Sequence, residues 1–292
     1  MNRRQMLAFC GLCASGTAGC LSGTPSRPGS GAEETTADDG TETTADGPDE
    51  TPPADGVAVD DIAVRKAVRY ESSMGSGGVL AVEGRQYVVA SVRAPGDASA
   101  SDFAFRTDSE SWHPGLSDTV GARNVSVAGR EGGPVGRGFG GDDRSYLAFE
   151  VPSPLSASNP RIRFESGDSE WPLPVEERVR LDAPAPRFEL DSVDAPEEVS
   201  QGETMSVSLT ATNVSDTDGR FLAAVYWPTD VIADDDESHV IERAVAAGDE
   251  MTASVDIDTS YTTNEDGPVT LSVRGHVSAE RDVRVRNAST PS

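Results

Sequence analysis

The sequence of 292 residues contains very little cysteine, lysine or aromatic side chain. Its three cysteines, Cys10, Cys13 and Cys20, all lie in the first 20 residues, and Lys66 is its only lysine. The chain after residue 20 therefore has no disulfide, no thiolate nucleophile and no zinc site that uses cysteine. Aromatic residues make up 5% of the chain, so any core must be built mainly from small aliphatic side chains.

Long hydrophobic runs are also missing. The apolar stretch at residues 5–14 follows Arg3 and Arg4 and is too short to span a bilayer. An arginine pair before such a stretch resembles a twin-arginine export signal, although the general secretion route stays open. We expect residues 1–20 to be an export signal.

The segment Thr-Ala-Gly-Cys at residues 17–20 resembles a lipobox, in which the cysteine is lipidated after cleavage. A single acyl chain binds a membrane only marginally, so stable anchoring requires two lipid chains on Cys20. The alternative is a plain signal peptide that happens to contain a cysteine. Lipidation would place the protein on the extracellular face of the cell membrane.

Basic residues are scarce, with 24 against 50 acidic residues and a formal net charge of −26. This charge excludes nucleic acid as a partner, because phosphate binding requires a basic face. Acidity spread over a chain almost without lysine is typical of proteins from salt-loving archaea, since a Debye length of about 3 Å at 1 M salt screens the self-repulsion. An acidic patch for a cationic partner is the alternative.

Residues 21–56 carry nine acids and one arginine, with no large apolar residue after Leu21. Such a segment cannot bury enough apolar surface to offset the entropy of ordering. We expect a disordered acidic tether with an r.m.s. reach of roughly 30–36 Å.

After residue 56, apolar and polar residues alternate with period two, and no stretch sustains the apolar stripe of a helix. In the region 57–186 this pattern predicts strands that include residues 86–92, 146–151, 161–164 and 178–181. Prolines 184 and 186 mark a boundary, and residues 187–287 form a second region before a tail at 288–292. Seven strands are predicted there, at residues 188–193, 205–213, 221–227, 240–245, 251–257, 269–275 and 282–285.

Seven strands in about 100 residues is the count of an immunoglobulin-like sandwich. We therefore expect an all-β protein with two immunoglobulin-like antiparallel β-sandwiches after the acidic linker. Residues 221–227 are apolar on both faces, which predicts a central strand.

Two family resemblances follow from these segments. Gln-Gly-Glu at 201–203, Asn-Val-Ser-Asp at 213–216 and Ala-Gly-Asp-Glu at 247–250 resemble CARDB modules, which are immunoglobulin-like domains of archaeal and bacterial surface proteins. The segments 87–92, 103–106 and 147–152 are similar to DUF4352-type immunoglobulin-like domains of lipoproteins. Together with the composition, these resemblances imply a haloarchaeal surface lipoprotein, and neither family implies catalysis.

Residues 136–141 match the spacing G-x-G-x-x-G, but a strand follows them where a nucleotide site needs a helix. We therefore expect no nucleotide partner. Arg130, Arg137 and Arg144 could form a small anion site beside this glycine loop.

Metal and catalytic sites are not predicted. His113, His239 and His276 lie in no recognisable triad context, and a blue-copper site requires a cysteine thiolate. The acidic run at residues 234–237 lacks the spacing of an EF-hand loop. We expect no cofactor and no enzymatic activity.

Three sequons, at Asn124, Asn213 and Asn287, are glycosylation acceptors if the chain is exported. Trp112, Trp171 and Trp227 are candidates for stacking on sugars, although core packing is the preferred interpretation. Trp227 ends the central strand.

The function expected is that of a non-enzymatic, lipid-anchored cell-surface protein with a binding, adhesion or accessory role. Its partners would be the membrane, through the lipid on Cys20, and a surface protein or glycan. The alternatives are a structural component of the envelope without a discrete ligand, or an extracellular hydrolase. The first region carries 19 acids and 14 bases against 22 and seven in residues 187–292, so it is the better candidate to meet a partner.

Overall fold

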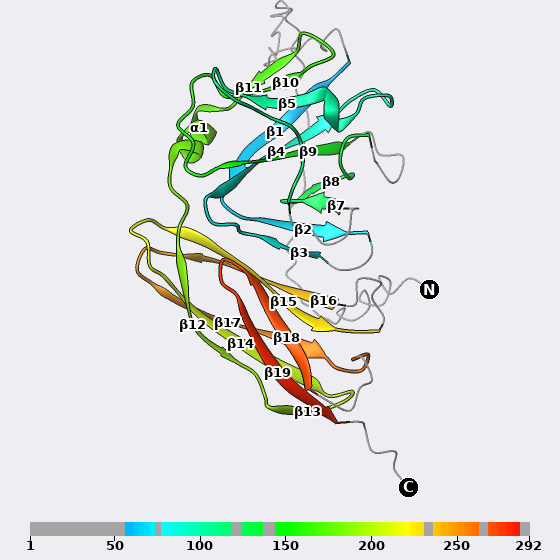
Figure 1. The fold of residues 1–292 in the computed structure, drawn as a ribbon, viewed down its shortest axis with the longest axis vertical. Coiled ribbons are helices and arrows are strands. Elements are labelled where there is room, and N and C mark those ends of the chain that lie inside the picture. Colours follow the sequence, from blue (N-terminus) through cyan, green and yellow to red (C-terminus); the bar gives the residue numbers. More distant parts are fainter. Residues whose placement is uncertain are drawn as a thin grey trace, which may run out of the picture. The chain divides into compact units, whose positions relative to one another are not determined.

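The computed structural model describes residues 56–73, 77–117, 124–136, 144–230, 236–262 and 268–286 (Figure 1). The expected export signal with Arg3 and Arg4, the lipidation site Cys20, the tether up to residue 55 and the tail lie outside these residues. Within them the structure is mostly β-strand, arranged in five sheets, so the prediction of an all-β fold is confirmed.

The first region, residues 57–186, holds three antiparallel sheets whose strands pair only with one another. One sheet has the order β1 (Ala58–Arg65), β4 (Arg85–Arg93), β9 (Ser145–Pro152). A second has the order β11 (Glu170–Pro172), β10 (Arg161–Phe164), β5 (Phe103–Arg106), β6 (Ser111–Trp112). The third has the order β3 (Gly77–Leu80), β2 (Val68–Ser72), β7 (Asn124–Val127), β8 (Arg130–Glu131).

Strand β4 is buried on both faces because two cores meet at it. Val88 and Ala90 belong to a core that also contains Phe105 and Phe149. Tyr87 and Val89, which alternate with them, belong to a core that includes Val68 and Tyr70. The alternation expected of a strand therefore places apolar side chains in a core on either side of β4.

The strand predicted at residues 178–181 is wrong, because this segment lies in helix α1 (Val175–Asp182). Alternation over four residues also fits one helical turn, and the side chains that are buried, Glu177 and Leu181, are one turn apart. Val179, which a strand would have buried, is 66% exposed. The Glu177 carboxylate fixes the helix by accepting the backbone N–H of Val64 at 2.7 Å.

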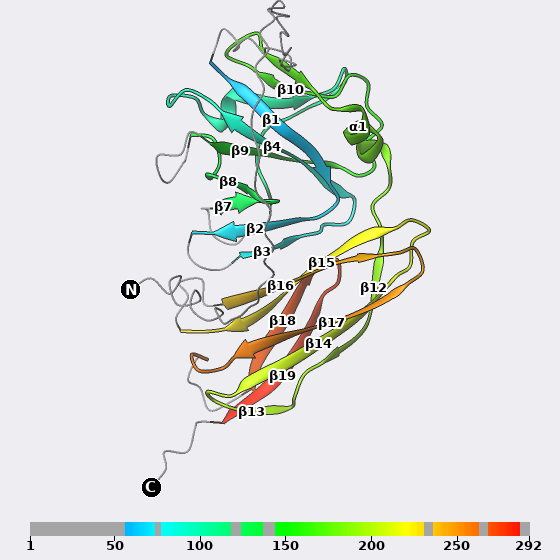
Figure 2. The ribbon, with the colours of Figure 1, turned by 180° about the vertical axis from the view of Figure 1, so that it is seen from behind.

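In the second region, residues 187–286, all seven predicted strands are present (Figure 2). One sheet has the order β12 (Phe188–Asp194), β14 (Thr204–Asn213), β17 (Glu250–Asp258). The other has the order β13 (Glu198–Ser200), β19 (Ala279–Arg286), β18 (Pro268–Gly275), β15 (Gly219–Pro228), β16 (Asp236–Val245). Strand β13, which pairs in parallel with β19, was not predicted because three residues are too short to show alternation.

Strand β15 lies between β18 and β16, as the central strand expected at residues 221–227. One of its faces contributes Phe221, Val225 and Trp227 to a core built from both sheets of the second region. Its other face contributes Leu222, Ala224 and Tyr226 to a smaller cluster.

This smaller cluster also contains Ala67 and Val79 of the first region, and we call it the apolar joint. A hydrogen bond from the Gly77 backbone N–H to Ser238 Oγ, at 3.1 Å, lies beside it. The joint explains why β15 is apolar on both faces, and it makes the two regions neighbours within one compact unit.

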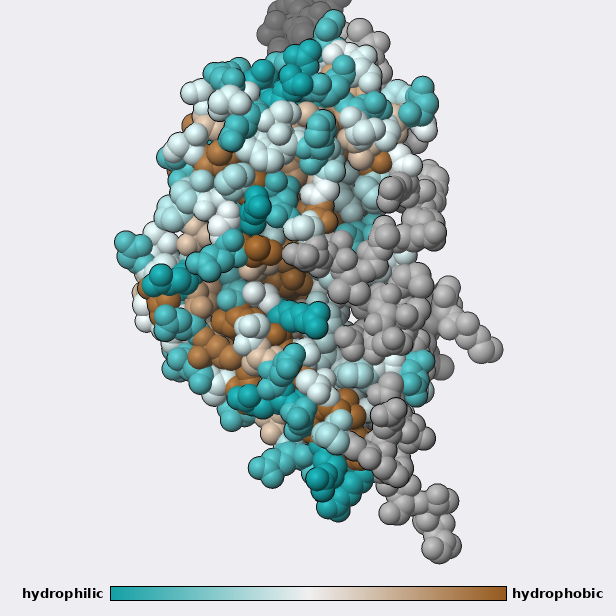
Figure 3. Space-filling model, viewed as in Figure 1, coloured by the Kyte–Doolittle hydropathy of each residue, from teal (hydrophilic) through white to brown (hydrophobic). Residues whose placement is uncertain are grey.

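Hydrophilic side chains cover most of the face seen in Figure 3, with smaller hydrophobic patches between them. Among the described residues, the large apolar side chains that are exposed are Val82, Val175, Val179 and Tyr261. Two of these, Val175 and Val179, lie one turn apart on α1.

Candidate functional site

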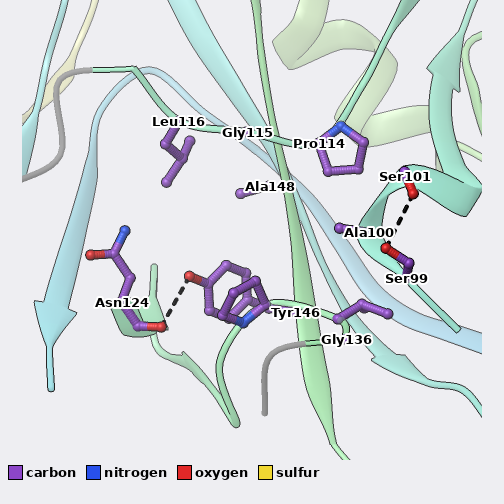
Figure 4. Close-up of a pocket in the computed structure, with 12 residues that line it drawn as sticks. Ser99, Ala100, Ser101, Pro114, Gly115, Leu116, Asn124, Gly136, Tyr146 and Ala148 are labelled. Carbon is purple, nitrogen blue, oxygen red and sulfur yellow. Dashed lines mark hydrogen bonds between the residues drawn. The ribbon is translucent and has the colours of Figure 1, made fainter. Parts of the chain in front are cut away.

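A groove of about 510 Å³ opens on the first region (Figure 4). None of the described residues that line it carries a charge, and we call it the uncharged groove. They come from the 3-10 turn at Ala100–Asp102, the segment after β6, the start of β7, the turn before β9, and β9 itself. They are Ser99, Ala100, Ser101, Pro114, Gly115, Leu116, Asn124, Pro134, Val135, Gly136, Tyr146 and Ala148.

Backbone hydrogen bonds hold the walls of this groove in place. Gly115 N–H donates to Ala148 O at 2.9 Å, which fixes the segment after β6 against β9. The N–H of Tyr146 donates to Gly133 O at 2.9 Å and fixes the turn that precedes β9. At the opposite wall, Ser99 N–H donates to the Asp102 carboxylate at 2.8 Å. Contacts within the fold therefore fix three of the segments that line the groove.

Polar and apolar groups both line this groove. The Tyr146 hydroxyl donates to the Asn124 backbone carbonyl at 3.4 Å, and the hydroxyls of Ser99 and Ser101 are 3.1 Å apart (Figure 4). Burial raises the pKa of Tyr146 to about 12, so its hydroxyl stays protonated at neutral pH. Small hydroxyl groups beside an apolar surface suit a ligand that combines apolar area with neutral hydrogen-bonding groups.

Asn124 Oδ1 is buried and has no hydrogen-bond partner among the described residues. A buried acceptor without a donor costs about 1–3 kcal/mol. Because it has almost no exposed surface, this oxygen lies within the wall of the groove and not on its open face.

Two of the three arginines expected to form an anion site beside the glycine loop line one hollow. Arg130 and Arg144 line a hollow of about 740 Å³ together with Arg93, which sequence reasoning did not identify. Asp61 and Glu131 also line it, so the hollow carries both signs of charge. Arg137 and the glycine loop from residue 137 onward lie outside the described residues.

Arg130 is held in that hollow by main-chain oxygens. Its guanidinium donates to Asp61 O and, at 3.2 Å, to Ala128 O. Arg93 pairs with the Asp60 carboxylate at 2.9 Å. Two of the three arginines therefore already have partners within the fold.

The predicted sequons differ in accessibility. Asn124 begins β7 and lines the uncharged groove, whereas Asn287 lies outside the described residues. Asn213 is fully buried, and its side-chain nitrogen donates to three carbonyls, of Thr217, Val245 and Ala246, at 2.9–3.3 Å. A sugar on that nitrogen would displace these contacts, so the fold disfavours glycosylation at Asn213.

The three histidines lie in separate surroundings. His276 is packed between Phe188 and Phe221, with ring centroids 4.9 and 5.9 Å away. Its Nδ1 accepts the Leu222 backbone N–H at 2.9 Å, and burial lowers its pKa to about 4. His113 lies in a loop and His239 in β16, so the structure does not bring the histidines together.

No group of three histidine, cysteine, aspartate or glutamate side chains is arranged to hold a metal ion within the described residues. Residues 234 and 235 of the acidic run lie outside them.

The described part of the chain contains no helix long and apolar enough to cross a membrane.

The tryptophans pack as expected of core residues. Trp227 is fully buried, and its indole N–H donates to Thr262 Oγ1 at 2.8 Å. Trp112 and Trp171 are partly buried against the core of the first region. The ring of Trp112 lies 5.6 Å from that of Phe105.

No protein-family model and no curated protein matches this chain. Solved structures show partial likenesses. A β-glucosidase from Listeria innocua is 25% identical, with 35% of this chain and 16% of that chain covered and a TM-score of 0.30. A β-D-glucoside glucohydrolase from Trichoderma reesei is 12% identical, with 36% and 19% covered and a TM-score of 0.29.

The alkylpurine DNA glycosylase AlkC of Pseudomonas fluorescens is 13% identical, with 37% of this chain and 34% of that chain covered and a TM-score of 0.28. The chain spans 16% of the length of the Listeria structures that it matches first. TM-scores this low carry no argument about activity, substrate or partner.

Proposed function

We propose that this chain is a non-enzymatic protein anchored by lipid to the extracellular face of the cell membrane, where its first region binds an uncharged segment of a surface protein or glycan. The observation that carries the proposal is the uncharged groove. Charged residues make up 25% of the chain, yet none of the described residues that line this groove is charged.

An uncharged groove suits the salty surroundings that the composition indicates. At 1 M salt the Debye length is about 3 Å, so attraction between surface charges contributes little to binding. Apolar burial persists under those conditions, and excluded salts strengthen it. A groove whose described lining combines uncharged polar and apolar groups therefore offers recognition that does not depend on charge.

The anchor belongs to the same proposal. Cys20, the preceding lipobox-like residues and the acidic tether would hold the folded regions away from the bilayer. The two regions are proposed to be immunoglobulin-like sandwiches, the second similar to CARDB modules. This is supported by the single core that the β12-β14-β17 sheet shares with the five-stranded sheet.

The binding part is tested by filling the groove. A Cβ placed on Gly115 meets no atom within 4 Å, so Gly115→Trp introduces a large side chain into open space. Gly96 also has open space and does not line the groove, so Gly96→Trp is the matched control. The assay is binding of neutral oligosaccharides and of capped, uncharged peptides at molar salt. Equal binding by the two variants would refute the groove as the site.

The anchor is tested separately with Cys20→Ser. Membrane fractions from cells that express this variant should contain much less of the protein than those from wild-type cells. A variant that stays as membrane-bound as the wild type would refute lipidation at Cys20 and leave the groove proposal intact.

A structural component of the envelope is the second candidate, and the apolar joint favours it. Because Ala67 and Val79 pack against β15, the two regions would move as one rigid spacer. This candidate predicts that no neutral probe binds and that loss of the chain changes the envelope mechanically.

A further inference from the structure

A second cleft gathers basic side chains in a chain that has few of them. Arg65 at the end of β1, Lys66 beside it, Arg180 on α1 and Arg220 on β15 all line one cleft of about 450 Å³. We call this the basic cleft. It lies next to the apolar joint, at the segment that connects the two regions, and every residue that lines it belongs to the described residues. Four of the 24 basic residues thus meet in one place.

The guanidinium groups are close enough to affect one another. Burial lowers the pKa of Arg65. The attraction of Glu177 raises it in part, and repulsion from Arg220 and Arg180 lowers it further. Like charges that face a common space repel unless an anion enters it.

Lys66 is positioned by neutral acceptors. Its ammonium group donates to Gln86 Oε1 at 2.6 Å, to Ala183 O at 2.5 Å and to Ser153 Oγ at 3.4 Å. Gln86 is in turn fixed by its own bonds to Pro152 O and Leu181 O, at 2.7 and 2.9 Å. None of these partners carries a charge, so the bonds orient the ammonium without neutralising it.

Arg65 likewise keeps its charge. Its guanidinium donates to the Val64 carbonyl at 3.0 Å, and it makes no ion pair with a described residue. Arg180 pairs with Glu177, and Arg220 pairs with Glu242 at 2.8 Å in an exposed position. Arg65 and Lys66 therefore enter the cleft without an ion pair to a described residue, although the carboxylates of Glu177 and Asp182 attract them, and Arg180 and Arg220 lie beside them.

The remaining lining is mostly apolar and proline-rich. Val64, Ala67 and Leu222 form one side, and Pro184 and Pro186 form another. Asp218 is the one acidic residue among those that line the cleft. A volume of about 450 Å³ falls in the range of small-molecule sites, and the guanidinium fork matches the oxygens of a carboxylate or phosphate.

From this arrangement we infer that the basic cleft binds a small organic anion, with an oxyanion group at the Arg65 guanidinium, near the positive charge of Lys66, and an apolar body against Val64, Leu222 and the two prolines. The site is separate from the uncharged groove, and its ligand is of the opposite kind. A test of anion binding at the basic cleft therefore does not depend on whether the uncharged groove binds a ligand.

Lys66 gives a direct readout of occupancy because it is the only lysine. Reductive methylation of the full-length protein at pH 8 in molar KCl, read by mass spectrometry of the Lys66 peptide, reports access to this one side chain. Burial lowers the pKa of Lys66 to about 8, although the attraction of Asp182 acts to raise it. The free amine is therefore present at pH 8. The probes are hexanoate, hexyl phosphate and hexanamide, which share an apolar body and differ in charge.

We expect hexanoate, hexyl phosphate or both to slow Lys66 methylation saturably, while hexanamide has no effect. The stronger of the two anions identifies the oxyanion that the cleft prefers. Arg220→Gln and Arg65→Gln should each weaken the protection about tenfold, which corresponds to the loss of one charge-assisted contact. Arg69→Gln removes an exposed arginine of β2 that does not line the cleft and should leave protection unchanged.

Three results would overturn the inference. One is protection by hexanamide equal to that by the anions, and another is the absence of protection by either anion. The third is equal protection in the Arg220→Gln and Arg69→Gln variants. Far-UV circular dichroism and the melting temperature of each variant establish that it is folded before the comparison is made.

Discussion

Replacing Glu177 by alanine removes the contact that fixes α1 to the first region. The side chain is 5% exposed, and its Oε2 accepts the buried backbone N–H of Val64 at 2.7 Å. A buried donor left without a partner costs about 1–3 kcal/mol. The ion pair with Arg180 adds at most about 1 kcal/mol, because Arg180 is half exposed and solvent screens it. The expected loss for Glu177→Ala is therefore about 2–3 kcal/mol.

In a unit of this size that loss lowers the melting temperature by about 5–10 °C. The assay is thermal unfolding followed by circular dichroism at constant molar KCl. Glu177→Gln keeps an acceptor for Val64 N–H and should lose less than half as much. Glu176→Ala, at the exposed neighbour on the same helix, is the control and should change the melting temperature little. A Glu177→Ala variant as stable as Glu176→Ala would show that the carboxylate does not fix the helix.

Three further predictions concern stability. The pKa of His276 in the folded chain, about 4, lies below its ordinary 6.5, so stability is full above about pH 6.5 and is lost as pH falls towards 4. The loss reaches about 3 kcal/mol, and His276→Gln should remove this part of the pH dependence in denaturant unfolding. Ala224→Arg puts a charge into the apolar joint and should split a single calorimetric transition into two, whereas one unchanged transition would contradict the joint. Lowering salt from molar to about 0.1 M should destabilise the wild type through the repulsion of its net charge of −26, and flat stability would contradict the adaptation to salt.

Most strands of the second region could be predicted because their side chains alternate over six residues or more. Strand β14 shows this in its burial, with Met205, Val207 and Leu209 inside and the intervening residues more exposed. The segment 221–227 was also predicted to be a central strand, since a strand with apolar residues on both faces must be packed against other residues on each face. What covers the second face, Ala67 and Val79, is over 140 residues away along the chain, so no local pattern could identify the joint.

Alternation over only a few residues does not distinguish a strand from a short helix. Residues 178–181 alternate like a strand, yet the tertiary contact of Glu177 with β1 selects a helix. A buried glutamate is rare, and the sequence holds no sign that its partner is a backbone N–H 113 residues away. The same limit applies to Asn213, whose sequon suggests an exposed residue although the fold uses its amide as a buried donor.

The sites were predicted least well. Arg130 and Arg144 were expected together and do line one hollow, but Arg93 was missed. The uncharged groove and the basic cleft are each assembled from segments that only the sheet pairing brings together. The sequence does single out Lys66, because it is the only lysine in 292 residues, but it does not indicate which residues surround it.

The most direct test of the proposed binding role is titration of the mature protein with uncharged oligosaccharides and capped peptides at molar salt, followed by chemical shifts of the groove residues. We predict that a neutral probe shifts the resonances of Asn124, Tyr146 and Gly115, and that Gly115→Trp weakens its affinity about tenfold or more while Gly96→Trp does not. If no neutral probe shifts these resonances, or if both variants bind as the wild type does, the uncharged groove is not a binding site.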